Sequence, residues 1–251
     1  MTLTVLQDLR SGLRPVRDQG RRPTCLSFAA SAVHEQARTD PDPLCVEWLF
    51  YHAAQRAGTG PREGTTIPDT RQVLHDLGQP LESVWPYGGQ LPSSTAWRPP
   101  VGAAPLFRCG SDGCGGDLAH IKHALDRSRP VFLALFVSGA FTAATKWLRT
   151  GTEIILPDDS ESIDRQRGHA VVAVGHGRLG SEDLILIRNS WGPGWGASGH
   201  AWVRSSYVAR RLFGGFSISE GEGDVLQSDA GGVDARARGL RQHVVCVHSP
   251  V

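Results

Sequence analysis

The order of secondary-structure patterns along the chain is the feature that most constrains its fold. The segment CLSFAASAVHEQAR, which begins at Cys25, repeats apolar residues at the three- and four-residue spacing of a helix, and helices are also predicted over 46–56 and 68–77. Later apolar and β-branched runs, separated by turn residues, predict antiparallel strands over 130–137, 169–174, 184–188 and 200–204. Helices followed by strands within 251 residues indicate an α+β protein.

Composition divides the chain into three predicted parts. The stretch from Trp85 to Pro105 is rich in Pro, Gly and Ser, which is typical of a long connection between two lobes. We predict an N-terminal segment, mostly irregular over its first twenty residues, and a helical lobe over 1–105. A β lobe follows over 106–219. Residues 220–251 are poor in aromatics, so we expect a loosely ordered tail in which HVVCV at 243–247 forms one late strand.

Cys25 is predicted to lie in the first turn of the first helix, with Thr24 as its N-cap. Unpaired N–H groups and the helix dipole favour an anion there and lower the pKa of a thiol. The thiolate is the attacking species in cysteine chemistry, so the position suits a nucleophile. A cysteine beside Phe28 and Ala29 is more commonly a small buried hydrophobe, and the position alone does not decide between the two.

Four other residues complete a candidate catalytic set. His169 begins an apolar run and could exchange a proton with a thiol and a leaving group. Asn189 precedes a Gly/Trp-rich turn and could orient that imidazole, while Trp191 could shield the hydrogen bond from water. Gln19 could donate to an oxyanion together with the Cys25 N–H. Each residue has an ordinary structural interpretation by itself, and only the combination points to chemistry.

The segments VRDQGRRPTCLSFA, RGHAVVAVGHG and LIRNSWGPGWG resemble, in this order, the three active-site blocks of the papain-like (C1) cysteine peptidases. The resemblance runs from about residue 8 to 208 and includes Trp85-Pro86-Tyr87. It implies an α+β, papain-like two-lobe fold, with a helical N-terminal lobe, an antiparallel β lobe and the active site in the cleft between them. It also implies Cys25 as nucleophile, His169 as general base and acid, Asn189 as the group that orients it, and Gln19 as oxyanion donor.

The same resemblance implies a substrate site and a reaction. Gly64 and Thr65 stand where the family has a Gly-Gly ledge for an extended peptide, and Ala170 and Trp191 are the other implied substrate contacts. The implied activity is hydrolysis of peptide bonds in a protein or peptide through an acyl-enzyme. Two alternatives stay open: transfer of the acyl group to an amine, as in peptide maturation, and non-catalytic peptide binding.

The sequence departs from the family pattern near the nucleophile. Arg22-Pro23-Thr24 replaces the usual run with an earlier cysteine, so the usual disulfide of that lobe cannot form, and Leu26 replaces an aromatic residue. Thr65 replaces a glycine. Because the resemblance begins close to Met1, no pro-segment is expected. Arginines near the nucleophile form either a solvated loop or a cleft wall that favours acidic substrates: Arg10, Arg14, Arg17, Arg21 and Arg22.

Charge and cysteine content bear on partners and location. The net charge of +1 gives no reason to expect nucleic acid or an anionic membrane as partner, and no signal peptide or spanning segment is evident. Five cysteines are an odd number, so at least one thiol should be free. We expect a cytoplasmic protein, and only two lysines among 26 basic residues suggest a bacterial gene. Residues 220–251 could cover the cleft or bind a regulatory partner.

Two cysteines and two histidines are the remaining candidate for a functional site, as ligands of a metal ion. Cys109 and Cys114 lie near His120 and His123, but this spacing falls outside the usual structural zinc patterns. We therefore expect no metal and no cofactor. The two cysteines could instead pair with each other or remain thiols.

Overall fold

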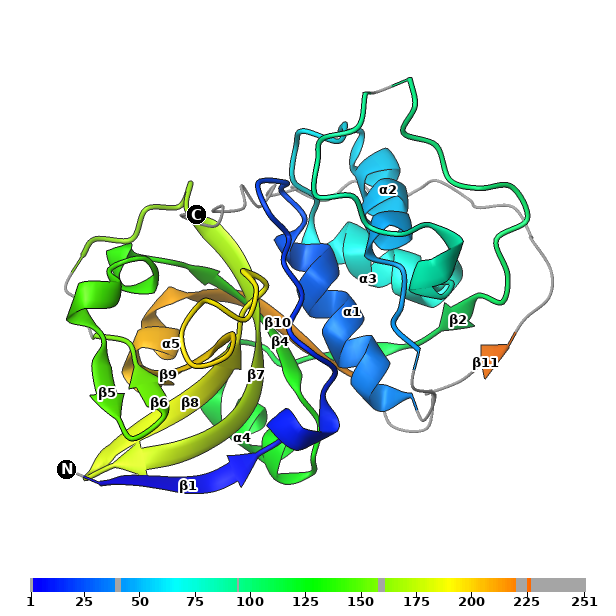
Figure 1. The fold of residues 1–251 in the computed structure, drawn as a ribbon. Coiled ribbons are helices and arrows are strands. Elements are labelled where there is room, and N and C mark those ends of the chain that lie inside the picture. Colours follow the sequence, from blue (N-terminus) through cyan, green and yellow to red (C-terminus); the bar gives the residue numbers. More distant parts are fainter. Residues whose placement is uncertain (1, 39–41, 94, 158–160, 220–224, 227–251) are drawn as a thin grey trace.

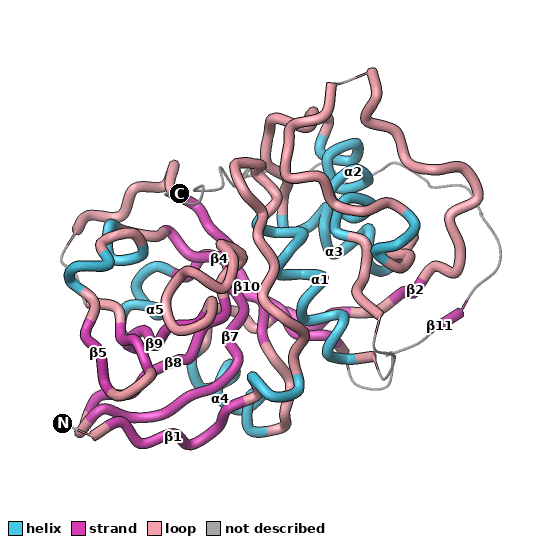
Figure 2. Tube along the Cα trace, in the orientation of Figure 1, coloured by secondary structure: helices cyan, strands magenta, loops and turns pink. Residues whose placement is uncertain are grey.

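The computed structural model describes residues 2–38, 42–93, 95–157, 161–219 and 225–226. The chain forms two lobes that lie side by side, one of helices and one built on a twisted sheet (Figures 1 and 2). The helical lobe holds α1 (Cys25–Ala37), α2 (Val46–Ala57) and α3 (Ile67–Asp76). Helices α4 (Leu118–Asp126) and α5 (Ser205–Arg211) belong to the sheet lobe. None of the described helices has the length and apolar content needed to cross a bilayer.

The large sheet has the strand order β3-β10-β4-β7-β8-β9-β6-β5, with β1 beside β7. Its pairs are antiparallel except β6 with β9, which is parallel. Its strands are β1 (Leu3–Asp8), β3 (Ser111–Gly113), β4 (Val131–Phe136), β5 (Leu148–Thr150), β6 (Glu153–Ile155), β7 (Gly168–Leu179), β8 (Glu182–Arg188), β9 (His200–Arg204) and β10 (Leu212–Ile218). A second, small sheet pairs β2 (Phe107–Arg108) with β11 (Val225–Leu226).

The helices of the first lobe begin and end close to their predicted positions, and local caps explain why. Helix α2 begins after Cys45, whose sulfur accepts a hydrogen bond from the Trp48 N–H. Helix α3 begins after Thr66, whose hydroxyl accepts from the Asp69 N–H, and Gly78 follows its end at a φ of 75°. Thr24 occupies the predicted N-cap position of α1, but its side chain makes no cap hydrogen bond and instead contacts the Tyr87 hydroxyl.

The N-terminal strand is the main difference from the sequence prediction. The sequence predicts an irregular start to the helical lobe over 1–105, but β1 pairs antiparallel with the second half of β7. Gly175 and Gly177 make this approach feasible, since a Cβ at these positions would lie 2.3 Å from the Gln7 carbonyl oxygen and 2.5 Å from that of Thr4. The strand was missed because its partner lies far along the chain and its outer side chains are exposed.

Short elements account for the other differences. Strands β2, β3, β5, β6 and β10 and helix α5 lie in segments for which no element was predicted, because two- to seven-residue runs carry little periodicity. In the tail, β11 pairs with β2. The predicted strand at 243–247 lies outside the described residues.

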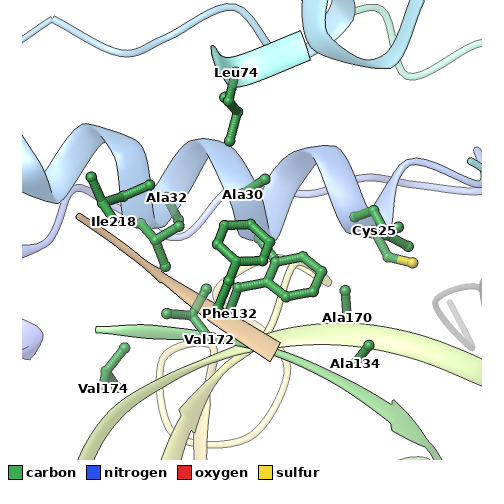
Figure 3. Packing of buried hydrophobic residues seen from close by; sticks show 14 of the residues in the cluster. Cys25, Ala30, Ala32, Leu74, Phe132, Ala134, Ala170, Val172, Val174 and Ile218 are labelled. Carbon is green, nitrogen blue, oxygen red and sulfur yellow. The ribbon is translucent and has the colours of Figure 1, made fainter. Parts of the chain in front are cut away.

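Helix α1 is the central element of the core. Every residue from Cys25 to Glu35 is buried, because α1 packs between the other helices and the sheet. Figure 3 shows the shared cluster, with Leu74 of α3 on one side of α1 and Phe132 and Val172 of the sheet on the other. A second cluster lies on the opposite face of the sheet, beneath α4 and α5. The start of α1, and with it Cys25, is therefore fixed by packing on both sides.

Two helix-ending glycines provide a matched test of the packing of the small sheet against α3. Gly58 and Gly78 have nearly the same φ, 73° and 75°, but a Cβ at Gly78 would lie 2.2 Å from the Phe107 carbonyl oxygen, whereas nothing lies within 4 Å of one at Gly58. We expect Gly58→Ala to lower the free energy of unfolding by about 1 kcal/mol through backbone strain alone. Gly78→Ala should lower it by about 2–4 kcal/mol. Urea denaturation measures both, and equal losses would contradict this packing.

Candidate active site

Cys25 is the first residue of α1 and is fully buried. In Figure 3 it lies at one end of the cluster between the lobes, beside Ala170 of β7. Ala170 follows His169 directly, so the structure brings the predicted nucleophile and the segment of the predicted base to the same end of the interface. The helix N-terminus faces this point with N–H groups that favour a negative charge.

The oxidation state of Cys25 bears directly on its chemistry. Its sulfur is part of a disulfide in this structure, whereas Cys45, Cys109 and Cys114 are not disulfide-bonded. Cys109 and Cys114 thus do not pair, and Cys246 lies outside the described residues. A disulfide sulfur cannot act as the attacking thiolate, so the structure represents an oxidised state that must be reduced before any reaction at Cys25.

The other described thiols are poorly suited to nucleophilic chemistry. Burial raises the pKa of Cys45 to about 12, and burial also raises the pKa of Cys114. Their sulfurs therefore remain protonated at neutral pH. The described residues hold no group of three or more His, Cys, Asp or Glu side chains arranged for a metal ion.

His169 and Asn189 form the geometry expected of a base and its orienting group. The His169 Nε2 lies 2.7 Å from the Asn189 Oδ1, and both side chains are buried. The Trp191 ring lies beside the imidazole with a centroid separation of 4.8 Å, and the Phe141 ring meets it edge-on at 6.3 Å. The Asn189 carbonyl oxygen also accepts the Ser190 N–H at 2.8 Å, which fixes the amide. The imidazole is thus held in one plane inside an aromatic enclosure.

Gln19 lies in the interface between the lobes and not on the surface. Its side chain is fully buried, donates from Nε2 to the Arg22 carbonyl oxygen at 3.1 Å and accepts from the Ser190 hydroxyl at 2.6 Å. Its backbone N–H donates to the Ser190 carbonyl oxygen at 2.8 Å. Because Ser190 is the neighbour of Asn189, these bonds join the loop before the nucleophile to the turn that orients the base.

The predicted substrate contacts lie on both sides of the same boundary. The Gly64 carbonyl oxygen accepts from the Thr59 hydroxyl at 3.3 Å, and Thr65 is buried. Two residues further along, Ile67 faces β10, where a Cβ at Gly214 would lie 2.5 Å from its Cδ1. On the sheet side, Ala170 and Trp191 are buried. Their role as substrate contacts stays a prediction.

The basic run near the nucleophile is mostly engaged in ion pairs. Arg10 contacts Asp8 and Glu153, Arg17 contacts Glu82 at 2.7 Å, and Arg22 contacts Glu47. The hypothesis of a basic wall is therefore wrong for these three residues. Arg21 is exposed.

A second buried pair of charges lies behind the site, and sequence reasoning missed it. Burial raises the pKa of Glu35 and lowers that of Arg188 to about 10. The Arg188 guanidinium donates to the carbonyl oxygens of Arg14 and Pro15, and a small cavity between the lobes is lined by both Glu35 and Arg188. These groups tie the N-terminal segment to the end of β8, immediately before Asn189. No motif marks them, because each depends on contacts that form only in the fold.

Comparisons with known proteins identify similar chains. The family model described as papain family cysteine protease matches residues 111–210. The rice oryzain gamma chain is 26% identical over 190 residues, which cover 74% of this chain and 50% of the relative. The chain therefore spans about half the length of the curated relatives it matches.

Solved structures share the fold over most of the chain. Xylellain, a cysteine protease from Xylella fastidiosa, superposes with a TM-score of 0.65 over 84% of each chain at 23% identity. A Carica candamarcensis cysteine protease in complex with E-64 superposes with a TM-score of 0.64 at 23% identity, over 84% of this chain and 96% of that one. The chain has the papain-like fold. The predicted α+β fold, with the site between a helical and a sheet lobe, is confirmed.

The Asn189 hydrogen bond should control how readily this papain-like site activates its thiol. We expect Asn189→Ala to slow alkylation of reduced Cys25 by iodoacetamide about 10-fold at neutral pH, because an imidazole without its fixed partner holds the thiol proton less well. Asn189→Asp keeps an acceptor oxygen, so its alkylation rate should fall less than that of the alanine variant. Mass spectrometry of the alkylated peptide measures the rate, with Cys45 as an internal unreactive thiol. Equal rates in the wild type and the alanine variant would contradict the role.

Proposed function

We propose that the protein is a cysteine endopeptidase that hydrolyses peptide bonds through an acyl-enzyme on Cys25. The observation that carries the proposal is the hydrogen-bonded pair of His169 and Asn189, enclosed by Trp191, at the end of the interface where α1 begins with Cys25. A nucleophile at a helix start and an oriented imidazole across an interface are the two parts that thiol acyl chemistry needs.

The first half of the reaction forms the acyl-enzyme. After reduction, the Cys25 thiolate attacks the peptide carbonyl carbon, and the carbon–oxygen π electrons move onto oxygen. The Gln19 amide has a second N–H besides the one that bonds the Arg22 carbonyl, and with the Cys25 backbone N–H it stabilises this oxyanion. The imidazolium of His169 then protonates the leaving amine as the carbon–nitrogen bond breaks, which leaves a thioester.

The second half releases the acid. A water molecule attacks the thioester carbonyl while His169 accepts one of its protons. The carbon–sulfur bond then breaks, the carboxylic acid departs and the thiolate returns beside the imidazolium. The Asn189 oxygen holds the ring plane through both proton transfers, and Trp191 keeps competing water from that hydrogen bond.

We infer that the substrate is a protein or peptide bound in extended form along Gly64 and Thr65 on one lobe and Ala170 and Trp191 on the other. The related Carica structure, solved in complex with E-64, supports a cleft that holds peptide-like molecules. If the thioester instead passes to an added amine, mass spectrometry will find amide products, and the protein is an acyl transferase.

We further propose that this is a bacterial, cytoplasmic protein. The likeness to xylellain, a bacterial protein, supports the origin. Cys45, Cys109 and Cys114 lie outside any disulfide, which suits a reducing compartment, and such a compartment would also reduce the disulfide of Cys25. Fractionation of the native host with an antibody against the protein tests the location, and recovery in the culture medium would refute it.

The nucleophile assignment gives a direct prediction. With dithiothreitol present, the wild type should hydrolyse fluorogenic peptides and gain the mass of one E-64 molecule at Cys25. Cys25→Ala should do neither, while Cys114→Ala, which removes a buried thiol of raised pKa, should keep both. Activity that survives in Cys25→Ala would refute the mechanism.

The oxidised state of Cys25 predicts latency. Protein purified without reductant should show little hydrolysis, and dithiothreitol should raise the rate at least about 10-fold as the disulfide becomes a thiolate. Titration of free thiols before and after reduction measures the change. Full activity in protein whose Cys25 remains oxidised would contradict the prediction.

The tail hypothesis from the sequence also stays a prediction, because most of residues 220–251 lie outside the described residues. We expect a chain that ends at Ser219 to show a higher rate of peptide hydrolysis than the full chain if the tail covers the cleft. An unchanged rate and unchanged binding of cellular partners would remove the idea.

A further inference from the structure

We propose that Arg22 and Glu47 form a positioning pair that holds the Gln19 amide in its place at the active site. This inference rests on the proposed function, since it assigns a role in the same reaction. Neither residue matches a family motif, and neither touches the nucleophile through any bond described above. The pair acts through the short loop that separates Gln19 from Cys25.

The pair is almost completely buried and doubly bonded. The two terminal nitrogens of Arg22 donate to the two carboxylate oxygens of Glu47 at 2.5 and 2.6 Å, and both side chains are less than 5% exposed. The guanidinium also donates to the Gly88 carbonyl oxygen at 2.8 Å, and Glu47 accepts from the Trp97 indole N–H at 2.6 Å. A bidentate pair with extra hydrogen bonds fixes both distance and orientation.

Aromatic rings complete the enclosure of the guanidinium. Its carbon lies 4.7 Å from the Tyr87 ring centroid and 5.6 Å from that of Phe50. The Tyr87 hydroxyl in turn donates to the Gln19 carbonyl oxygen at 2.8 Å and contacts the Thr24 hydroxyl at 2.9 Å. The residues that enclose Arg22 thus also hold both ends of the loop that carries it.

The backbone of Arg22 is the direct link to the oxyanion donor. Its carbonyl oxygen accepts both the Gln19 Nε2 and the Thr24 N–H. Because the side chain is clamped to Glu47, this carbonyl has a fixed position, and so does the amide that bonds to it. The direction of the second Gln19 N–H, which would meet the oxyanion, is set by that acceptor together with the Ser190 hydroxyl that donates to Gln19 Oε1.

The pair also lies in the segment where the papain-like family has a disulfide that this sequence cannot form. The resemblance described from the sequence places a cysteine of a disulfide just before the nucleophile, and Arg22 lies in that run. A buried ion pair is a non-covalent clamp that survives reduction, and the same reductant is needed to free Cys25. The loop can therefore keep its shape under the conditions in which the thiol is active.

A charge-free variant separates positioning from stability. Arg22→Met/Glu47→Gln removes both buried charges together, so no lone charge remains, and the glutamine still accepts from Trp97. Arg10→Met is the matched control, since it removes an arginine that pairs with two other carboxylates, those of Asp8 and Glu153. Thermal denaturation of the reduced proteins checks that each variant is folded.

Three measurements then test the role. We expect the double variant to lower kcat about 10-fold and to weaken binding of a peptide aldehyde, whose adduct carries the oxyanion, by the same factor. Alkylation of Cys25 by iodoacetamide forms no oxyanion and should stay within about twofold of wild type. In a Gln19→Ala background, the double variant should cause no further loss of kcat, because the group that it positions is gone.

The outcomes distinguish this inference from the proposed function. If the wild type hydrolyses peptides and the folded double variant keeps its kcat, the positioning role is wrong while the function stands. The role is also wrong if alkylation slows as much as hydrolysis, or if the loss is equal with and without Gln19. A reduced wild type that is alkylated at Cys25 yet hydrolyses no peptide overturns both.

Discussion

The burial of α1 between the other helices and the sheet is the constraint on which the rest of the structure depends. This helix has no solvent-facing side over its first eleven residues, so it cannot rotate or slide without breaking contacts with both lobes. The first residue of the helix is Cys25, and the position of Cys25 is therefore fixed by the packing of the core. Strand β7, which carries His169, packs against the same helix. One apolar interface thus sets the geometry of two chemical groups that come from distant parts of the sequence.

Polar contacts then refine what the apolar interface sets. Gln19 and Ser190 bond across the boundary of the lobes, Asn189 fixes His169, and Arg188 ties the end of β8 to the N-terminal segment. Consecutive residues 188 to 190 thus reach three different partners. A short turn after one strand thus contacts His169, Gln19 and the chain that leads to Cys25. Small shifts in this turn would reach all three groups together.

Sequence reasoning found the long helices and pointed to the candidate catalytic set because the signals of both are local. Periodic apolar residues and helix-ending glycines mark α2 and α3. The motifs around Cys25, His169 and Asn189 each consist of neighbouring residues, so they can be recognised without knowledge of the fold. It missed β1, whose pairing depends on Gly175 and Gly177 far along the chain, and it misjudged Thr24, whose hydroxyl meets Tyr87. It also could not find the pairing of Arg22 with Glu47, because a charge in a loop gives no sign of burial. Long-range contacts of short or polar segments are the part that local patterns do not encode.

The course of β7 has a practical consequence for how the protein can be handled. One end of this strand carries His169, while β1 runs along the other half with Leu3 opposite Leu179. Ten residues of strand separate His169 from Leu179, so an extended β7 places them roughly 30 Å apart. An affinity tag or fluorophore fused ahead of Leu3 would leave the molecule at that remote edge (Figure 1). The N-terminal side of the sheet is thus a place for attachment that leaves the entrance to the reacting groups clear.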